Sequence, residues 1–266
     1  MHIAETYNSI MLLKANSKML DNSKAIFIVF FMFMILCACA PKLKLNIVNK
    51  QLYPINKNMP LDSEMLAFYK PYKQKLDSVM NDIVAVSDIA LVKNKPEGPL
   101  NNLFADAIYN SAKAFNIDFD IFYSNYNGLR LPLPKGNIYR YNIFELMPFE
   151  NYLVSVKFSG SNTQKFFDFM AKSGGEPISG ATYSIKNSRA IDIMINNKPI
   201  DTAKSYTILT SDYIANGGDR GAVFYLGTNR KDYNLLMRTA TLQFLEKEKK
   251  AGRKLNPQID GRIKIK

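Results

Sequence analysis

Two short loops carry residues suited to holding a small ligand, and each follows an apolar run typical of a strand. Residues 124–130 contain Gly128, which permits positive φ and close backbone approach, and Arg130, whose planar guanidinium offers several donors. Residues 147–151 place the ring of Phe149 between a proline and a turn. These residue types favour recognition of a flat, partly anionic molecule.

A third loop, residues 212–220, adds the ring of Tyr213 and the carboxylate of Asp219. Together with Phe149 and Arg130, these residues supply what a purine nucleoside needs: two aromatic faces, a guanidinium and a hydroxyl-binding carboxylate. Stacking of a base on an aromatic side chain contributes about 1–3 kcal/mol. The combination therefore predicts a nucleoside or nucleotide site.

Each loop alone has a plainer interpretation. Arg130 would serve equally well in a surface ion pair, Phe149 as a core ring beneath a loop, and residues 216–219 as an ordinary turn. Only the three loops together point to a ligand site.

The chain has one histidine, His2, and two cysteines, Cys37 and Cys39, all near its N-terminus. If this segment is removed, no imidazole or thiolate remains for a zinc site, for Ser-His-Asp or Cys-His catalysis, or for acid–base work by histidine. The remaining carboxylates show no clustered spacing for a pair of metal ions. We therefore expect no catalytic residues, no metal site and no cofactor in this chain, the alternative being an all-carboxylate magnesium site that only the fold would bring together.

An apolar run at residues 25–36 follows three lysines and precedes Cys39, as in a signal peptide. It is shorter than the roughly 20 residues that span a bilayer, although a short membrane anchor or a buried helix remains an alternative. Residues 36–39, Leu-Cys-Ala-Cys, resemble a bacterial lipobox, which Cys37 would fit less well. We expect a lipoprotein signal peptide at residues 1–38, lipidation at Cys39 and a place in the bacterial cell envelope, periplasmic or surface-facing.

The formal net charge is +12. A basic surface favours anionic partners such as nucleotides or lipid headgroups, whereas the plainer alternative is a compositional bias toward solvated lysines. Residues 39–60 are polar and interrupted by prolines, which predicts an extended lead-in to a single domain at residues 61–266.

The elements that must position the three loops are both helical and extended. The spacing predicts a helix after Pro60, capped by Asp62 or Ser63 and kinked or split at Pro71. Met65, Leu66, Tyr69, Leu76 and Met80 recur on it at helical spacing. Further helices are expected at residues 101–115, after a cap at Ser161 or Asn162, and at residues 235–249.

Strands are expected at residues 83–86, 117–123, 152–158 and 206–210, with a hairpin formed by residues 191–195 and 198–200. The aromatic residues of the helix after residue 162 have core spacing rather than ligand-binding spacing. The fold class is therefore a mixture of α and β.

At this point the sequence resembles the C-terminal domain of the 5′-nucleotidases, over about residues 60–266. The likeness rests on the order and spacing of several short elements: residues 103–107 (Leu-Phe-Ala-Asp-Ala), the Asn-x-x-Gly-x-Arg element at 125–130, Pro148-Phe149, Ser159-Gly160, Ser179-Gly180 and residues 213–219. The resemblance implies an α+β fold, a four-layer α/β/β/α sandwich.

The resemblance also implies roles for single residues. Phe149 and Tyr213 would hold the nucleobase between them, and Asp219 would meet the ribose hydroxyls. The Asn-x-x-Gly-x-Arg element would contribute Asn125, Gly128 and Arg130 to substrate binding. An arginine that normally precedes the family's glutamate, here Glu97, is missing; Lys93, Asn94, Lys95 and Pro96 stand near its place, and a lysine does not replace a bidentate arginine.

Enzymes of this family also carry a metallophosphoesterase domain that holds two metal ions, and we expect this chain to have neither the length nor the histidines for such a domain. The resemblance therefore implies a nucleotide-binding half of a 5′-nucleotidase, acting in nucleotide catabolism with a separate metallophosphoesterase chain that holds the divalent metals. The alternatives are a stand-alone nucleoside- or nucleotide-binding lipoprotein and a surface protein that has lost the ligand. No polymeric nucleic acid is expected as a partner.

Overall fold

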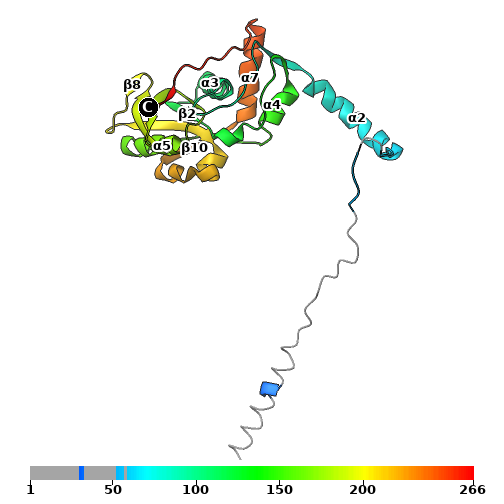
Figure 1. Ribbon diagram of the computed structural model, residues 1–266, viewed down its shortest axis with the longest axis horizontal. Helices are drawn as coiled ribbons and strands as arrows, with labels where there is room; N and C mark the ends of the chain where they lie inside the picture. The colour runs from blue at the N-terminus through cyan, green and yellow to red at the C-terminus, as the bar shows by residue number, and fades with distance from the viewer. Residues whose placement is uncertain (1–29, 33–51, 57–58) are drawn as a thin grey trace, which may run out of the picture. The chain divides into compact units, whose positions relative to one another are not determined.

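The structure, a computed structural model, describes residues 30–32, 52–56 and 59–266, so Cys39 and most of the expected signal peptide and lead-in lie outside the described residues. The chain divides into two compact units, Met1–Leu61 and Asp62–Lys266. The elements below all belong to the second unit (Figure 1). Within the described ranges, no helix has both the length and the apolarity to cross a bilayer.

A five-stranded sheet forms the centre of this unit. Its strand order is β10 (Thr228–Leu236), β4 (Tyr152–Ser159), β9 (Ser205–Ser211), β2 (Ile121–Tyr123) and β5 (Ile178–Ser179). Within this sheet, β2 and β9 pair in parallel and the other neighbouring strands pair antiparallel. Successive residues of a strand point to opposite faces, and here both faces are covered: Leu153 joins one core and Val154 the other.

The remaining strands form two smaller sheets. A four-stranded sheet has the order β11 (Ile263–Ile265), β6 (Ala181–Lys186), β7 (Arg189–Ile195) and β8 (Lys198–Pro199), and β1 (Ile83–Ser87) pairs with β3 (Gly136–Tyr139). The β7–β8 hairpin turns at Asn196 and Asn197, both with positive φ. Asparagine tolerates this conformation better than most residues, so the hairpin predicted from the sequence is confirmed.

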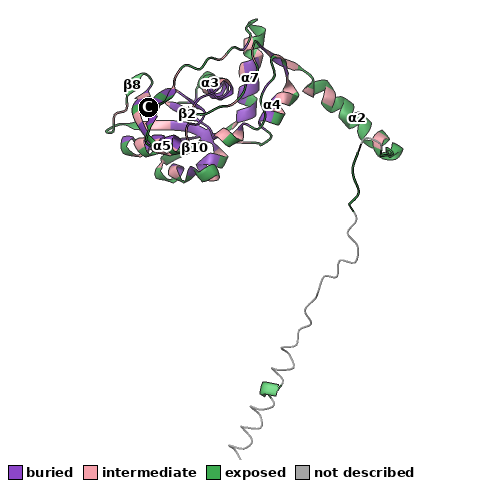
Figure 2. Cartoon of the chain, in the orientation of Figure 1, coloured by how far each residue is buried: buried purple, intermediate pink, exposed green. Residues whose placement is uncertain are grey.

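Two cores lie on opposite faces of the five-stranded sheet (Figure 2). Helices α3 (Pro99–Ala114) and α7 (Met237–Lys250) pack together over one face, and α4 (Arg140–Leu146) contacts α7. The other face meets the four-stranded sheet and α5 (Gly160–Lys172), whose Phe166 and Phe167 are fully buried. The mixed fold class and the α/β/β/α sandwich expected from the resemblance are confirmed.

Helix α2 (Ser63–Met80) precedes this sandwich and buries none of its residues. Asp62 caps it by accepting hydrogen bonds from the backbone N–H groups of Glu64 and Met65, both at 3.0 Å. Pro71 lies inside one continuous helix, so of the two predicted alternatives, a kink or a split, the split is wrong. The apolar stripe read from the sequence exists, but its side chains are largely exposed (Figure 2).

Other boundaries differ from the sequence prediction for local reasons. Helix α5 is capped by Ser159, whose hydroxyl accepts from Asn162 N–H, so the predicted cap at Ser161 or Asn162 is wrong. Strand β10 escaped prediction because its polar residues are mostly exposed and no apolar alternation marks it.

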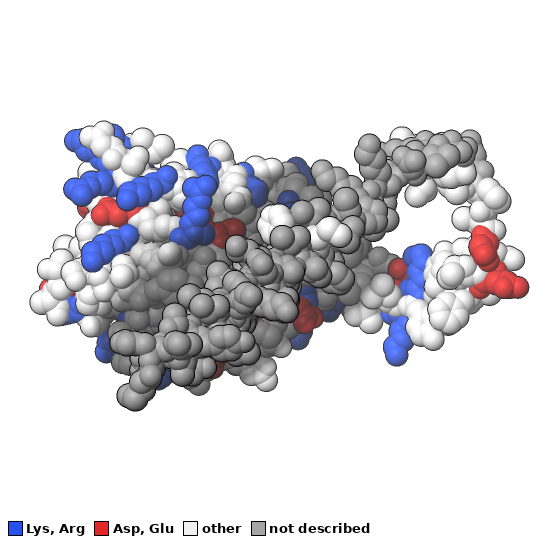
Figure 3. Space-filling view, turned by 90° about the horizontal axis from the view of Figure 1, so that it is seen from below, with Lys and Arg blue, Asp and Glu red and all other residues white. Residues whose placement is uncertain are grey.

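The surface of the described part is basic in places. Figure 3 shows Lys and Arg side chains gathered on part of one face, with fewer Asp and Glu among them. This grouping agrees with the net charge of the chain and would attract anionic partners.

Candidate functional site

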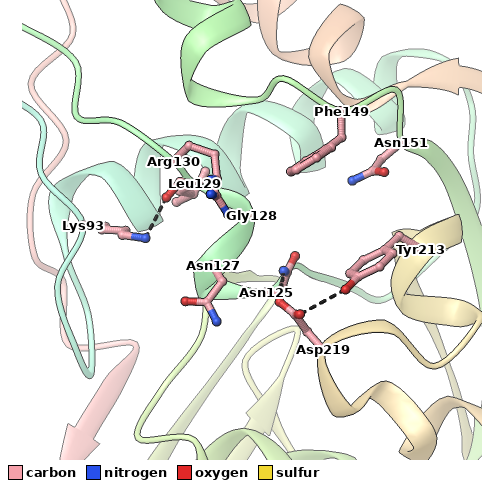
Figure 4. Close-up of a pocket in the computed structure, with 10 residues that line it drawn as sticks. All are labelled: Lys93, Asn125, Asn127, Gly128, Leu129, Arg130, Phe149, Asn151, Tyr213 and Asp219. Atoms are coloured by element: carbon pink, nitrogen blue, oxygen red, sulfur yellow. Dashed lines mark hydrogen bonds between the residues drawn. The ribbon is translucent and has the colours of Figure 1, made fainter. Parts of the chain in front are cut away.

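A cavity of about 560 Å³ brings the three predicted loops together (Figure 4). Volumes of about 300–1,000 Å³ are typical of small-molecule sites. Its lining consists of Lys93, Asn125, Asn127, Gly128, Leu129, Arg130, Phe149, Asn151, Tyr213 and Asp219. All six residues predicted to bind substrate are among them.

The first loop leaves β2 and forms a short 3₁₀ turn, Tyr126–Gly128. Gly128 N–H donates to the carbonyl of Asn125 at 3.1 Å. Of the two properties that glycine permits at this position, positive φ is not used, because the backbone of Gly128 is not left-handed. Its role is close approach: a Cβ at Gly128 would lie 2.8 Å from Oδ1 of Asn125.

Asp219 joins the first loop to the third. Its carboxylate accepts from Nδ2 of Asn125 at 2.5 Å and from the hydroxyl of Tyr213 at 3.1 Å. Asp219 has a φ of 46°, in the left-handed region where Asp and Asn are enriched. One carboxylate therefore fixes the amide of one loop and the ring of another.

The two predicted stacking rings are both partly exposed. Phe149 lies between α4 and β4 and is 54% exposed, while Tyr213 lies on the short helix α6 (Asp212–Ala215) and is 46% exposed. Figure 4 shows both rings on the same side of the pocket, opposite Lys93. Exposed rings beside a cavity offer an apolar face to a flat ligand.

Helix α6 is held at its N-terminal end, by its N-cap Ser211 and its first residue Asp212. The hydroxyl of Ser211 accepts from Ile214 N–H, and Asp212 Oδ1 accepts from Tyr152 N–H at 3.2 Å. Behind the ring of Tyr213, a Cβ at Gly218 would lie 2.5 Å from ring carbons. Glycine at this position therefore leaves room for the ring.

The opposite side of the pocket is cationic. Lys93 Nζ donates to the carbonyls of Leu129 at 2.7 Å and Tyr126 at 3.2 Å. Burial and the neighbouring Arg130 lower the pKa of Lys93. Arg130 is exposed, and its guanidinium makes no ion pair or hydrogen bond with any residue in the described part of the chain. This guanidinium is free to meet an anionic group.

Four lining residues were not in the predicted set: Lys93, Asn127, Leu129 and Asn151. Asn127 and Asn151 lie inside loops that the sequence had singled out. Counting every polar residue of those loops as a candidate would therefore have found both. Lys93 stands near the position of the missing arginine, which was also visible in the sequence.

Glu97 lies elsewhere. It is buried, and its carboxylate accepts from the backbone N–H groups of Asp260 and Gly261 at 2.8 and 3.1 Å. It therefore anchors the C-terminal segment rather than the pocket. Among residues 30–32, 52–56 and 59–266, no group of three or more His, Cys, Asp or Glu side chains is placed to hold a metal ion.

Residues 79–225 match the family described as 5′-nucleotidase, C-terminal domain. The match spans more than half of the chain, and the chain belongs to this family. It is 26% identical to the trifunctional nucleotide phosphoesterase YfkN of Bacillus subtilis, over 81% of this chain and 16% of that protein. It is also 28% identical to UshA of Escherichia coli, over 35% of this chain and 18% of UshA.

Solved structures show the same fold. The 5′-nucleotidase precursor of Thermus thermophilus aligns with a TM-score of 0.62 at 22% identity, covering 76% of this chain and 42% of that one. The NAD nucleotidase of Haemophilus influenzae aligns with a TM-score of 0.59 at 20% identity, covering 77% and 41%. The chain spans less than half the length of each of these relatives.

Proposed function

We propose that this chain binds a nucleoside 5′-monophosphate, or a similar nucleotide, in the pocket of Figure 4. The observation that carries the proposal is the convergence of all six expected residues on one cavity of suitable volume. The base would stack between Phe149 and Tyr213, while Asp219 and Asn125 would meet the ribose hydroxyls.

The pocket's chemistry supports an anionic nucleoside derivative over a neutral one. Arg130 and Lys93 place two cations opposite the rings, against the single carboxylate of Asp219. A guanidinium without a partner recognises phosphate oxygens in a bidentate manner. The nucleotide would thus be held by apolar contact at its base and by charge at its phosphate.

We propose further that hydrolysis requires a separate metallophosphoesterase chain. The support is the length of the relatives, of which this chain spans from 16% to 42%. Two-metal hydrolysis needs ions that polarise the phosphate and activate water. The partner would hold those divalent metals, and this chain would present the nucleotide as the binding half of a 5′-nucleotidase in nucleotide catabolism.

The place of action we propose is the bacterial cell envelope, through a lipid on Cys39. The support is the apolar run followed by Leu-Cys-Ala-Cys at residues 36–39. Mass spectrometry of the membrane fraction should find a lipid-modified N-terminus at Cys39 and none in a Cys39→Ser variant. Residues 1–38 still attached in the mature protein would overturn this assignment.

Calorimetry with AMP and adenosine tests the binding proposal. We expect both to bind, with AMP tighter, because only AMP engages Arg130 through its phosphate. Phe149→Ala should weaken both ligands, whereas Phe115→Ala, which removes a similarly exposed ring outside the pocket, should weaken neither. Absence of binding by any nucleoside or nucleotide, or equal effects of the two substitutions, would refute the proposal.

A further inference from the structure

Glu176 is a buried carboxylate beside the pocket that does not line it. Its Oε2 accepts a short hydrogen bond from the backbone N–H of Tyr126, fifty residues earlier in the chain. Its Oε1 lies 3.7 Å from Nζ of Lys95. Glu176 therefore connects two segments that the sequence did not associate with each other.

Two lysines complete the contact around Tyr126. Nζ of Lys93 lies 4.3 Å from the centroid of the Tyr126 ring and Nζ of Lys95 lies 5.1 Å from it, both within cation–π range. Lys93 also donates to the carbonyl of Tyr126, and Lys95 donates to the carbonyl of Ser173. Glu176, Lys93 and Lys95 thus together contact the amide, the carbonyl and the ring of Tyr126.

Tyr126 lies within the loop that carries the ligand-facing groups. It follows Asn125, whose amide donates to Asp219, and it precedes Gly128 and Arg130 in the same loop. A displacement of the Tyr126 backbone would move the Asn125 amide and the start of the Arg130 segment together. A small shift of a binding group is enough to weaken a pre-formed site.

Burial disfavours the charged form of Glu176 relative to its neutral form. Burial raises its pKa; the Tyr126 N–H, Ser173 and Lys95 oppose this rise, and Asp219 adds to it. When the pKa of a carboxyl is higher in the folded chain than in the unfolded chain, the folded chain becomes less stable as pH rises from the lower value to the higher one. The ionised form therefore costs folding free energy, which is typical of groups kept for function.

We propose that Glu176 is a positioning residue for nucleotide binding: its carboxylate, supported by Lys95, fixes the Tyr126 amide and so the Asn125–Arg130 loop. The inference rests on the proposed function for its effect on ligands. The contact between Glu176 and the loop is independent of that function. The two parts are therefore separable by experiment.

Removing the charge should weaken binding without weakening the fold. Glu176→Gln keeps an oxygen that can accept from Tyr126 but loses the charge-assisted hydrogen bond and the attraction to Lys95, so adenosine should bind about tenfold more weakly. Its unfolding midpoint at neutral pH should be unchanged or higher. Asp168→Asn is the matched control, because Asp168 also accepts from a backbone N–H, that of Ala190 at 2.9 Å, and lies outside the pocket lining.

The pH dependence distinguishes positioning from a purely structural role. Adenosine is a suitable ligand because it lacks the phosphate that titrates near pH 6. Wild-type affinity should fall as pH is lowered toward 4.5, the ordinary pKa of a glutamate. Because burial raises the pKa of Glu176, its carboxylate becomes protonated before that pH is reached. Among the described residues, the charged or titratable groups that interact with Glu176 include Lys93, Lys95, Asp219, Tyr123 and Tyr183. All remain in Glu176→Gln, whose affinity should vary less over this range.

Amide hydrogen exchange without ligand tests the contact itself. The Tyr126 amide should be protected in the wild type and exchange about tenfold faster in Glu176→Ala, which has no acceptor. Unchanged exchange would overturn the inference, whatever the ligand results. Faster exchange with unchanged adenosine affinity would overturn the positioning role. Failure of the wild type to bind any nucleoside would instead refute the proposed function, and the exchange data would still decide whether Glu176 holds the loop.

Discussion

At the scale of single residues, Asp219 connects two of the loops that line the pocket. It receives hydrogen bonds from Asn125 and Tyr213, and it does so from a left-handed backbone conformation. The sequence indicated that a carboxylate would stand near two aromatic rings. It did not indicate that this carboxylate holds one of the rings in place, because that depends on a turn conformation no local pattern specifies.

Substitution of Tyr213 should separate ring stacking from its hydroxyl contact. Tyr213→Ala should lose about 1–3 kcal/mol of AMP binding free energy, the contribution of one stacked base. Tyr213→Phe keeps the ring and loses only the hydrogen bond to Asp219, so its loss should be much smaller. Calorimetry of both variants checks this, and equal losses would argue against stacking on this ring.

Gly218→Ala should weaken nucleotide binding through the same ring. The added Cβ would lie 2.5 Å from ring carbons of Tyr213, so the ring must move out of place. A double-mutant cycle gives the control: in a Tyr213→Ala background, Gly218→Ala should cost almost nothing further, since no ring remains to be displaced. Additive losses in calorimetry would show that Gly218 acts by another route.

At the scale of elements, local patterns predicted best where a strand is mainly apolar or a turn is chemically marked. Strand β4 and the β7–β8 hairpin were expected at nearly their observed positions. The edge strand β10 was not, because its residues are mostly polar and exposed. Helix α2 shows the opposite case: its spacing predicted a helix correctly, but periodicity alone does not say what its apolar stripe packs against.

The stripe of α2 should contribute little to the stability of the isolated chain. Tyr69 is 41% exposed, so Tyr69→Ser should change the free energy of unfolding by less than about 0.5 kcal/mol. The control is Phe122→Ala in the five-stranded sheet, where the ring is fully buried and removal should cost about 3–5 kcal/mol. Urea unfolding measures both. A cost of about 2 kcal/mol for Tyr69→Ser would mean that the stripe is covered in solution.

At the scale of the whole molecule, the motifs behind the family resemblance fall into two groups. Some build the pocket, while others hold the sandwich together: Asp106 of the Leu-Phe-Ala-Asp-Ala element pairs with Arg262 at 2.8 and 2.9 Å and accepts from Ser179 at 2.7 Å. The sequence identified the motifs of both groups but did not indicate which of them build the pocket and which stabilise the fold. Glu176 was missed altogether, since its partner Tyr126 is distant in sequence and no spacing connects them.

The isolated chain should not hydrolyse AMP when magnesium, manganese, zinc or cobalt is added. The reason is the proposed division of labour, in which a separate chain provides the metals that phosphate hydrolysis requires. Release of inorganic phosphate measures the activity. Turnover by the purified chain that disappears when one of its own carboxylates is replaced would instead make it a hydrolase in its own right.

The most direct test of the account is a crystal structure of the chain with AMP. We predict the adenine between the rings of Phe149 and Tyr213, the ribose hydroxyls at Asp219, and the guanidinium of Arg130 in contact with the nucleotide. AMP bound outside this pocket, or a pocket that stays empty at saturating AMP, would contradict the central claim.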